Sequence, residues 1–310
     1  MKEAVKEFLA ALDADQTALA ALPFEDGAAR RWVEYRPHPR PGASLSGFDP
    51  RARKAAHRLL ATGLSEHAYA QAMAIIALEE VLDRREGWRR GRHSNDYWVT
   101  VFGDPAADEP WSWRFEGHHI SVTMTIVDGQ VSPAPVFLGA NPHRVKYGER
   151  AVLQPLSLEE ELARALLAAM DPSSRDEAIV ADQAPYDIRS GTSPSSSLIE
   201  PLGVHSGRLK GEARGILEEL VRLYIDRLPP ELAAAFAVEH VHIAWEGPTL
   251  PGGRHYYRIQ GDDLLIEYDN TTEDGNHAHT VLRRPKGDFG DDVLAAHRKA
   301  AHPPGGLNPG

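Results

Sequence analysis

The chain has 310 residues, a hydrophobic content of 42%, a charged content of 25% and a formal net charge of −11. An acidic surface argues against a nucleic-acid partner, because phosphates are neutralised by a basic surface, and no apolar run approaches the length of a membrane span. The absence of cysteine excludes disulfides, thiolate nucleophiles and Cys-ligated zinc.

The first segment, residues 1–95, is predicted to be mainly helical, because apolar residues recur at helical spacing before Leu22 and again from Leu59 onward. A Pro/Gly-rich connector between Val33 and Pro50 separates these helices. Ser65 is expected to cap the helix that runs to Glu86. The acidic, amphipathic start does not resemble a secretory signal, so we expect a cytoplasmic protein.

From about Tyr97 the apolar residues alternate with polar ones, which predicts β-strands. A continuous strand over residues 115–127 would place His118 on its apolar face and His119 on its polar face. The Asp128-Gly129 pair that follows is typical of a hairpin turn.

Helix is expected again at residues 157–170, where Ser157 and Glu160 fit a capping box. The polar segment 190–211 is predicted to be a surface loop that could act as a lid. A further helical stretch ends near residue 236, strands with a turn at Gly261 follow, and residues 291–302 are predicted to form the closing helix.

Helical and strand blocks alternate in bulk rather than as βαβ units, which favours an α+β fold with a mainly antiparallel sheet and helices packed around it. We expect one domain over residues 1–310, with a helical region at 1–95 and a sheet-containing core at 96–310 that carries a helical insertion at 155–235. The sequence shows no internal repeat, phosphate-binding glycine loop or Gly-x-Ser-x-Gly elbow.

Several motifs resemble the signatures of the family catalogued as domain of unknown function 3500. They are "WSWRFEGHHISV", "PVFLGANP", "HYYRIQG" and "IEYDNTTEDGNHAHTVLRRPKGDFG". The similarity extends from about residue 60 to 300, and one departure is Leu282, where the family more often has an aromatic residue. The resemblance supports the architecture and points to the same histidines, but it implies no substrate.

Histidines provide the strongest chemical signal. Two of them at i and i+2 on an extended segment point to the same side, as His277 and His279 would. Together with a histidine of the middle strand they could supply three nitrogens to zinc, iron, manganese or copper. The candidate metal ligands are His118, His119, His277 and His279.

Acidic and basic residues nearby complete the predicted site. Glu267 is the preferred general base, and Asp269 could complete the set of metal ligands. His255 is a further candidate for either role. Arg258 and Arg283 could anchor an anionic group of a substrate. Two further residues are expected to contact the substrate: Tyr257 as a pocket wall, and Asn276 as a hydrogen-bonding partner.

These patterns favour a metal-dependent enzyme that hydrolyses a small-molecule substrate with an ion-activated water. An iron or copper oxygenase with the same ligands and a non-catalytic metal- or ligand-binding protein are the alternatives. His118 beside Glu116 could also act as a metal-free general base. With 15 histidines in the chain, chance pairs are expected as well, and such residues are often ordinary hydrogen-bonded core or loop residues.

Overall fold

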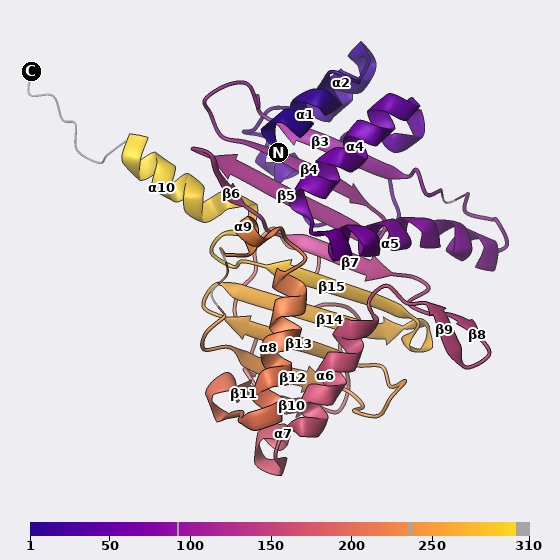
Figure 1. Ribbon diagram of the computed structural model, residues 1–310, viewed down its shortest axis with the longest axis vertical. Helices are drawn as coiled ribbons and strands as arrows, with labels where there is room; N and C mark the ends of the chain where they lie inside the picture. Colours follow the sequence, from indigo (N-terminus) through magenta and orange to yellow (C-terminus); the bar gives the residue numbers. More distant parts are fainter. Residues whose placement is uncertain (92, 235, 237, 302–310) are drawn as a thin grey trace, which may run out of the picture.

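The computed structural model describes residues 1–91, 93–234, 236 and 238–301. Its centre is a 13-stranded sheet in which ten strands follow the order β1-β3-β4-β5-β7-β15-β14-β13-β12-β10 (Figure 1). Strands β2, β6 and β11 pair beside this path, and β8 and β9 form a separate hairpin. The strands are β1 (Ala21–Leu22), β2 (Ala43–Ser44), β3 (Tyr97–Phe102), β4 (Trp111–Gly117), β5 (Ile120–Val127), β6 (Gln130–Ser132), β7 (Val136–Ala140), β8 (Val145–Tyr147), β9 (Arg150–Leu153), β10 (Ile179–Ala181), β11 (Val204–His205), β12 (His242–Glu246), β13 (Tyr256–Gly261), β14 (Leu264–Thr272) and β15 (His277–Arg283).

Neighbouring strands pair antiparallel, apart from β1 with β3 and β10 with β12, which pair parallel. The predicted α+β class with a mainly antiparallel sheet is therefore confirmed. The strands of the middle of the chain meet those of its C-terminal part where β7 pairs with β15. This seam carries the candidate site.

Helices cover one face of the sheet, with α4 and α5 over one half and α6 and α8 over the other (Figure 1). The α-helices are α1 (Lys2–Leu9), α2 (Ala14–Ala20), α3 (Gly27–Arg30), α4 (Pro50–Gly63), α5 (Glu66–Arg85), α6 (Ser157–Ala169), α7 (Pro172–Ala178), α8 (Gly211–Ile225), α9 (Pro230–Ala233) and α10 (Asp291–Ala301). Apolar strand residues such as Trp113, Met124 and Ile266 are buried beneath them in the main core. Among the described residues, no helix is both long and apolar enough to cross a membrane.

The opposite face of the sheet is also buried, yet it is rich in charged side chains. Arg114 and Glu116 of β4 and Arg258 and Glu267 of β13 and β14 are each 0% exposed. Loop residues cover much of this face. A small second apolar cluster on it combines loop residues with residues of β7 and β15 (Val33, Tyr35, Phe137, Ile188, Val281 and Phe289). Because buried charges are costly unless they are paired, this face demands many specific polar contacts.

The strands are arranged in the same way on either side of the β7–β15 pair, which indicates a duplication of the fold. In each half a strand of two (β1) or three (β10) residues pairs parallel with a longer one (β3, β12), and a second short strand (β2, β11) pairs antiparallel with that same strand. Each second short strand leads through a 3-10 turn, η1 (Leu45–Gly47) or η2 (Ser206–Arg208), into a long helix, α4 or α8. The two halves share strand pairings and single glycines rather than a run of similar residues, so the sequence shows no repeat although the strand arrangement does.

Equivalent positions in the two halves have equivalent roles. Gly42 and Gly203 both have positive φ (109° and 79°), and a Cβ would lie 2.8 Å from the Val99 carbonyl oxygen in one half and 2.0 Å from that of Ile243 in the other. Only glycine fits such a close approach. The β4–β5 turn, His118-His119, corresponds to the β13–β14 turn, Asp262-Asp263, since Gly117 pairs with Ile120 as Gly261 pairs with Leu264.

Several local predictions hold. Asp128 and Gly129 form the tight β5–β6 turn with φ of 50° and 77°, as expected for an Asp-Gly hairpin, and the turn after Gly261 is also present. Ser65 is the N-cap residue of α5, although its side chain does not bond to the helix backbone. The closing helix is α10, and the final residue predicted for it, His302, lies outside the described residues.

Other local predictions were wrong. Residues 115–127 are not one strand, because β4 ends at Gly117 and His119 has a positive φ of 64° in the turn. The prediction that His118 and His119 lie on opposite faces of one strand was therefore wrong. At α6 the N-cap is Leu156, without a side-chain cap, so Ser157 and Glu160 form no capping box. The prediction that residues 1–95 are mainly helical holds, although this region also contains the short strands β1 and β2.

Candidate metal centre

The candidate site lies at the seam of the duplicated sheet, where the β4–β5 turn approaches β7 and β15. His279 pairs with Gly139 across the seam. The turn is fixed to its surroundings by backbone bonds: the His119 amide donates to the Tyr35 carbonyl (3.0 Å), and the Gly139 amide donates to the His119 carbonyl (2.8 Å). These bonds hold His119 in the left-handed conformation, which histidine adopts more readily than bulkier residues.

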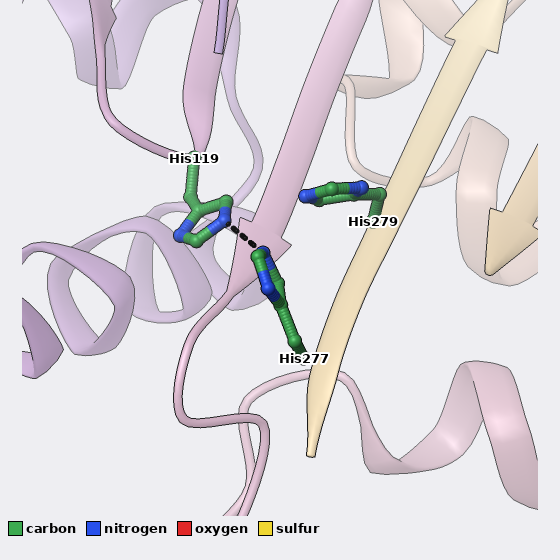
Figure 2. A group of neighbouring side chains, drawn as sticks. All are labelled: His119, His277 and His279. Atoms are coloured by element: carbon green, nitrogen blue, oxygen red, sulfur yellow. Dashed lines mark hydrogen bonds between the residues drawn. The ribbon is translucent and has the colours of Figure 1, made fainter. Parts of the chain in front are cut away.

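Three imidazoles converge at this seam. His277 and His279 project from the same side of β15, and the ring of His119 reaches them from the turn (Figure 2). The Nε2 atoms of His119 and His277 are 2.7 Å apart, and the ring centres of His279 lie 5.3 Å from His119 and 4.6 Å from His277. One nitrogen from each ring lies within 4.8 Å of one from each of the others.

Gly139 makes room for two of these rings. A Cβ at this position would lie 2.8 Å from Cδ2 of His119 and 3.1 Å from Cδ2 of His279. Contacts this short force neighbouring atoms to move. The glycine of the "PVFLGANP" motif therefore allows the two imidazoles to pack directly on the backbone of β7.

His279 is oriented by two carboxylates. Its Nδ1 lies 2.9 Å from Oδ1 of Asp187 and 3.2 Å from Oδ2 of Asp269, the residue paired with it on β14. Tyr35 donates its hydroxyl to the other oxygen of Asp187 at 2.8 Å. Burial lowers the pKa of His279, but the two carboxylates outweigh it and raise the pKa to about 10. Since Nδ1 faces the carboxylates, Nε2 is the nitrogen on the ion-binding side of the ring.

His277 has a different environment. Its Nδ1 lies 3.4 Å from the Asn141 amide nitrogen and 3.7 Å from Oε1 of Glu273, and Asn141 also donates to Glu273 at 2.8 Å. Burial is the main cause that lowers the pKa of His277. A histidine that stays neutral keeps a lone pair available for a metal.

His118 lies beside the three rings rather than among them. Its ring stacks on that of His119 with centres 3.7 Å apart, and its Nδ1 is 2.5 Å from Oε1 of Glu79 on α5. Glu79, His118 and His119 also lie close enough to share an ion. Both Glu79 and His118 line a cleft of about 490 Å³ that opens to solvent beside the centre.

Two predicted catalytic residues lie on the same face of the sheet as the histidines. Asp269 contacts His279 directly. Glu267 is fully buried, and it accepts hydrogen bonds from the Tyr256 hydroxyl (2.8 Å) and the backbone amides of Arg189 and Ser190 (2.7 and 3.2 Å). Burial raises the pKa of Glu267, against the effect of these donors. Its present contacts secure the segment that carries Asp187.

His255 and Tyr257 lie on the other, helix-covered face. The His255 ring stacks on Trp245 with centres 4.3 Å apart, and burial lowers its pKa to about 3. Tyr257 donates its hydroxyl to the Glu159 carbonyl of α6 at 2.9 Å. The fold thus separates these two candidates from the three converging imidazoles.

The remaining predicted residues make internal contacts. Arg258 donates to Glu246 at 2.6 Å and to the Pro201 carbonyl, and Arg283 donates from Nε to Asp288 at 2.7 Å. Asn276 accepts the Arg144 amide at 2.7 Å and lines a second cleft, of about 460 Å³.

Sequence reasoning missed four contributors to the site: Glu79, Gly139, Asn141 and Asp187. Gly139 and Asn141 belong to the quoted "PVFLGANP" motif, which was a usable signal. Glu79 reads as an ordinary residue of an amphipathic helix, and Asp187 lies in a loop without any motif. Only the tertiary fold brings these two acids to the histidines.

The family of the chain follows from comparison with family models. Residues 1–291 match the model described as "Protein of unknown function (DUF3500)", so the chain belongs to that family. Searches of curated proteins and of solved structures found no match.

Proposed function

We propose that the protein is a metal-dependent hydrolase of a small-molecule substrate, with His119, His277 and His279 as ligands of one divalent transition-metal ion. The observation that carries the proposal is the convergence of these three imidazoles at the β7–β15 seam. Three imidazole nitrogens suit zinc, iron or copper better than magnesium or calcium, and the ion would have to displace the extra proton that the raised pKa of His279 keeps on its ring. They also leave a position for water, as catalytic sites require.

The observed spacing fits an ion after a small adjustment. Nitrogens that bind a tetrahedral ion at 2.0–2.1 Å lie about 3.3–3.4 Å from each other, whereas His119 and His277 are hydrogen-bonded at 2.7 Å. An ion would replace the shared proton and widen the pair by about 0.6 Å. The contacts of Asp187 and Asp269 with His279 follow the carboxylate–histidine–metal arrangement that orients ligands in known centres.

A bound ion would lower the pKa of its water and polarise a substrate carbonyl. In place of Glu267, we assign the exchange of protons with this water to His118. The ring of His118 lines the cleft, stacks on His119 and is held by Glu79. Glu267 instead positions the backbone of Arg189 and Ser190.

The proposal is tested by hydrolysis assays on untagged protein that has been stripped with a chelator. A panel of p-nitrophenyl esters and acyl anilides is assayed before stripping, after stripping and after adding back single divalent ions. We expect activity to disappear on stripping, to return with one ion, and to be absent in the His277→Ala/His279→Ala variant. The matched control, His205→Ala/His242→Ala, changes a pair of neighbouring histidines on β11 and β12 and retains activity.

Three results would contradict the proposal. Unchanged hydrolysis by the stripped protein would show that the metal takes no part in the reaction. Oxygen consumption by a protein that holds a coloured, redox-active metal ion would indicate an oxygenase. Tight retention of a ligand without turnover would indicate a binding protein.

A further inference from the structure

The 490 Å³ cleft beside the candidate centre has walls of two kinds. Trp98 near the start of β3 and two prolines of the loop before β2, Pro37 and Pro39, provide flat apolar surfaces. His118 also lines the cleft, and its ring stacks on that of His119 with centres 3.7 Å apart. A ligand in this cleft would therefore be separated from His119 by the ring of His118.

The duplicated fold shows that these residues are not required by the architecture. The position of Trp98 on β3 corresponds to His242 on β12, because Trp98 pairs with Glu116 as His242 pairs with Gln260. His118 corresponds in the same way to Asp262. Since the second half folds with a histidine and an aspartate at these places, strand pairing alone does not require the tryptophan and the histidine of the first half. Their contacts are instead with residues of the cleft, Trp98 with the Arg40 guanidinium at 5.7 Å and His118 with Glu79.

The charged groups of the cleft are of both signs and already have partners inside the protein. The Arg40 guanidinium donates to the carbonyls of Arg36 (2.6 Å) and His38 (2.9 Å) and lies 3.5 Å from Glu116. Glu79 contacts His118, and Asp96 accepts the His93 amide at 3.1 Å. Such groups can still exchange hydrogen bonds with a ligand. Because the cleft is lined by two guanidiniums (Arg40 and Arg90) and two carboxylates (Glu79 and Asp96), a strongly charged ligand of either sign would meet groups of like charge, which disfavours it.

Flat apolar walls and charge-balanced donors and acceptors suit a neutral sugar ring. The carbon-bound hydrogens of a pyranose pack against an indole face or a proline ring, while its hydroxyls both donate and accept hydrogen bonds. We propose that the cleft binds the neutral sugar ring of an acylated carbohydrate, with the acyl group directed past His118 to the centre. This inference rests on the proposed hydrolytic function.

The reaction that follows is ester hydrolysis with water as the second reactant. The water oxygen forms a bond to the acyl carbon, and the bond between that carbon and the sugar oxygen breaks. The departing sugar oxygen takes up a proton. The products are the free sugar and the carboxylic acid, so atoms and electrons balance without an oxidant or reductant.

Saturation-transfer NMR and calorimetry test the sugar site directly. The probes are the methyl pyranosides of glucose, galactose, xylose and N-acetylglucosamine, with benzoate and inorganic phosphate as charged comparators. We expect at least one glycoside to bind saturably, and Trp98→Ala to weaken its binding at least tenfold while Trp98→Phe weakens it less. The control Tyr147→Ala removes an aromatic ring that is 82% exposed on β8 and leaves binding unchanged.

Failure of all four glycosides to bind, tighter binding of benzoate or phosphate, or equal binding by Trp98→Ala would overturn the inference. Its failure can be told apart from failure of the proposed function. His277→Ala/His279→Ala is expected to lose metal and hydrolysis but to bind the glycoside within threefold of the wild type. If the wild-type protein binds the glycoside but holds no metal, the cleft is supported as a sugar site and the proposed metal-dependent hydrolase is contradicted.

Discussion

The Nε2 atoms of His119 and His277 lie 2.7 Å apart, although 158 positions separate the two residues in the chain. At this distance one imidazole donates a hydrogen bond to the other, so the pair already directs two nitrogens at one point. The β7–β15 pairing and the backbone bonds of Gly139 hold the two segments together. The first three predictions that follow test the surroundings of this pair, and the fourth tests a buried histidine on the opposite face of the sheet.

Asp187→Asn and Asp269→Asn should each weaken metal binding. The carboxylates orient His279 through Nδ1, and loss of such a partner typically lowers metal affinity about 10- to 100-fold. Competition with a metallochromic chelator measures the change. Asp128→Asn is the matched control, because Asp128 contacts His297 at 2.8 Å on the exposed surface. Equal affinities in all three variants would show that the carboxylates do not act on the centre.

Gly139→Ala should disturb the centre without removing any ligand. The added Cβ would press on the rings of His119 and His279, so we expect a loss of stability of about 1–3 kcal/mol from overpacking and weaker metal binding. Chemical denaturation and metal titration measure the two effects. Gly215→Ala on α8 is the control, since nothing lies within 4 Å of the added atom, and it should stabilise the helix by up to about 1 kcal/mol. Unchanged metal binding in Gly139→Ala would contradict the packing argument.

Glu267→Gln separates a structural role from a catalytic one. The carboxylate accepts bonds from Tyr256 and from two backbone amides, so the variant should lose about 1–3 kcal/mol of unfolding free energy. The value of kcat on the best ester should stay within a few-fold of the wild type. Loss of a general base would instead lower kcat about 10²- to 10⁴-fold. A fall of that size, with the stability unchanged, would restore Glu267 as the general base.

His255 should make the fold sensitive to acid. Burial, aided by Arg164, holds its pKa at about 3 in the folded state, whereas an unfolded histidine titrates near pH 6.5. Between these values the unfolded chain binds the extra proton, so stability falls as the pH drops, by up to about 1.4 kcal/mol per pH unit from this residue. Denaturation of His255→Gln between pH 7 and 4 should show a shallower slope, and the exposed control His67→Gln should keep the wild-type slope. Parallel slopes in all three proteins would contradict this assignment.

Regular patterns were predictable from the sequence, and departures from them were not. The period-two pattern of β15 correctly placed His277 and His279 on one side, because the strand continues through both residues. The same reasoning failed at His118 and His119, where a two-residue turn interrupts the alternation. Nothing in the local sequence distinguishes a buried His-His turn from two more residues of a strand.

Contacts between residues far apart in the chain were also not predictable from the sequence. Glu79 and Asp187 reach the histidines only because α5 packs beside β7 and a loop crosses the charged face of the sheet. The duplication could not be found in the sequence either. The two halves share strand pairings and single residues such as Gly42 and Gly203, which are too few to form a visible repeat. Sequence thus predicted the fold class and the location of the candidate site, while its partners required the tertiary structure.

The metal content of untagged protein tests the central claim most directly. Mass spectrometry of the purified chain, grown with zinc, iron, copper and manganese, should return close to one equivalent of a transition metal for the wild type and for the His205→Ala/His242→Ala control. The His119→Ala/His277→Ala/His279→Ala variant should return none while remaining folded. A wild-type protein that carries no metal and takes up none on titration, or a triple variant that keeps its ion, would contradict the account.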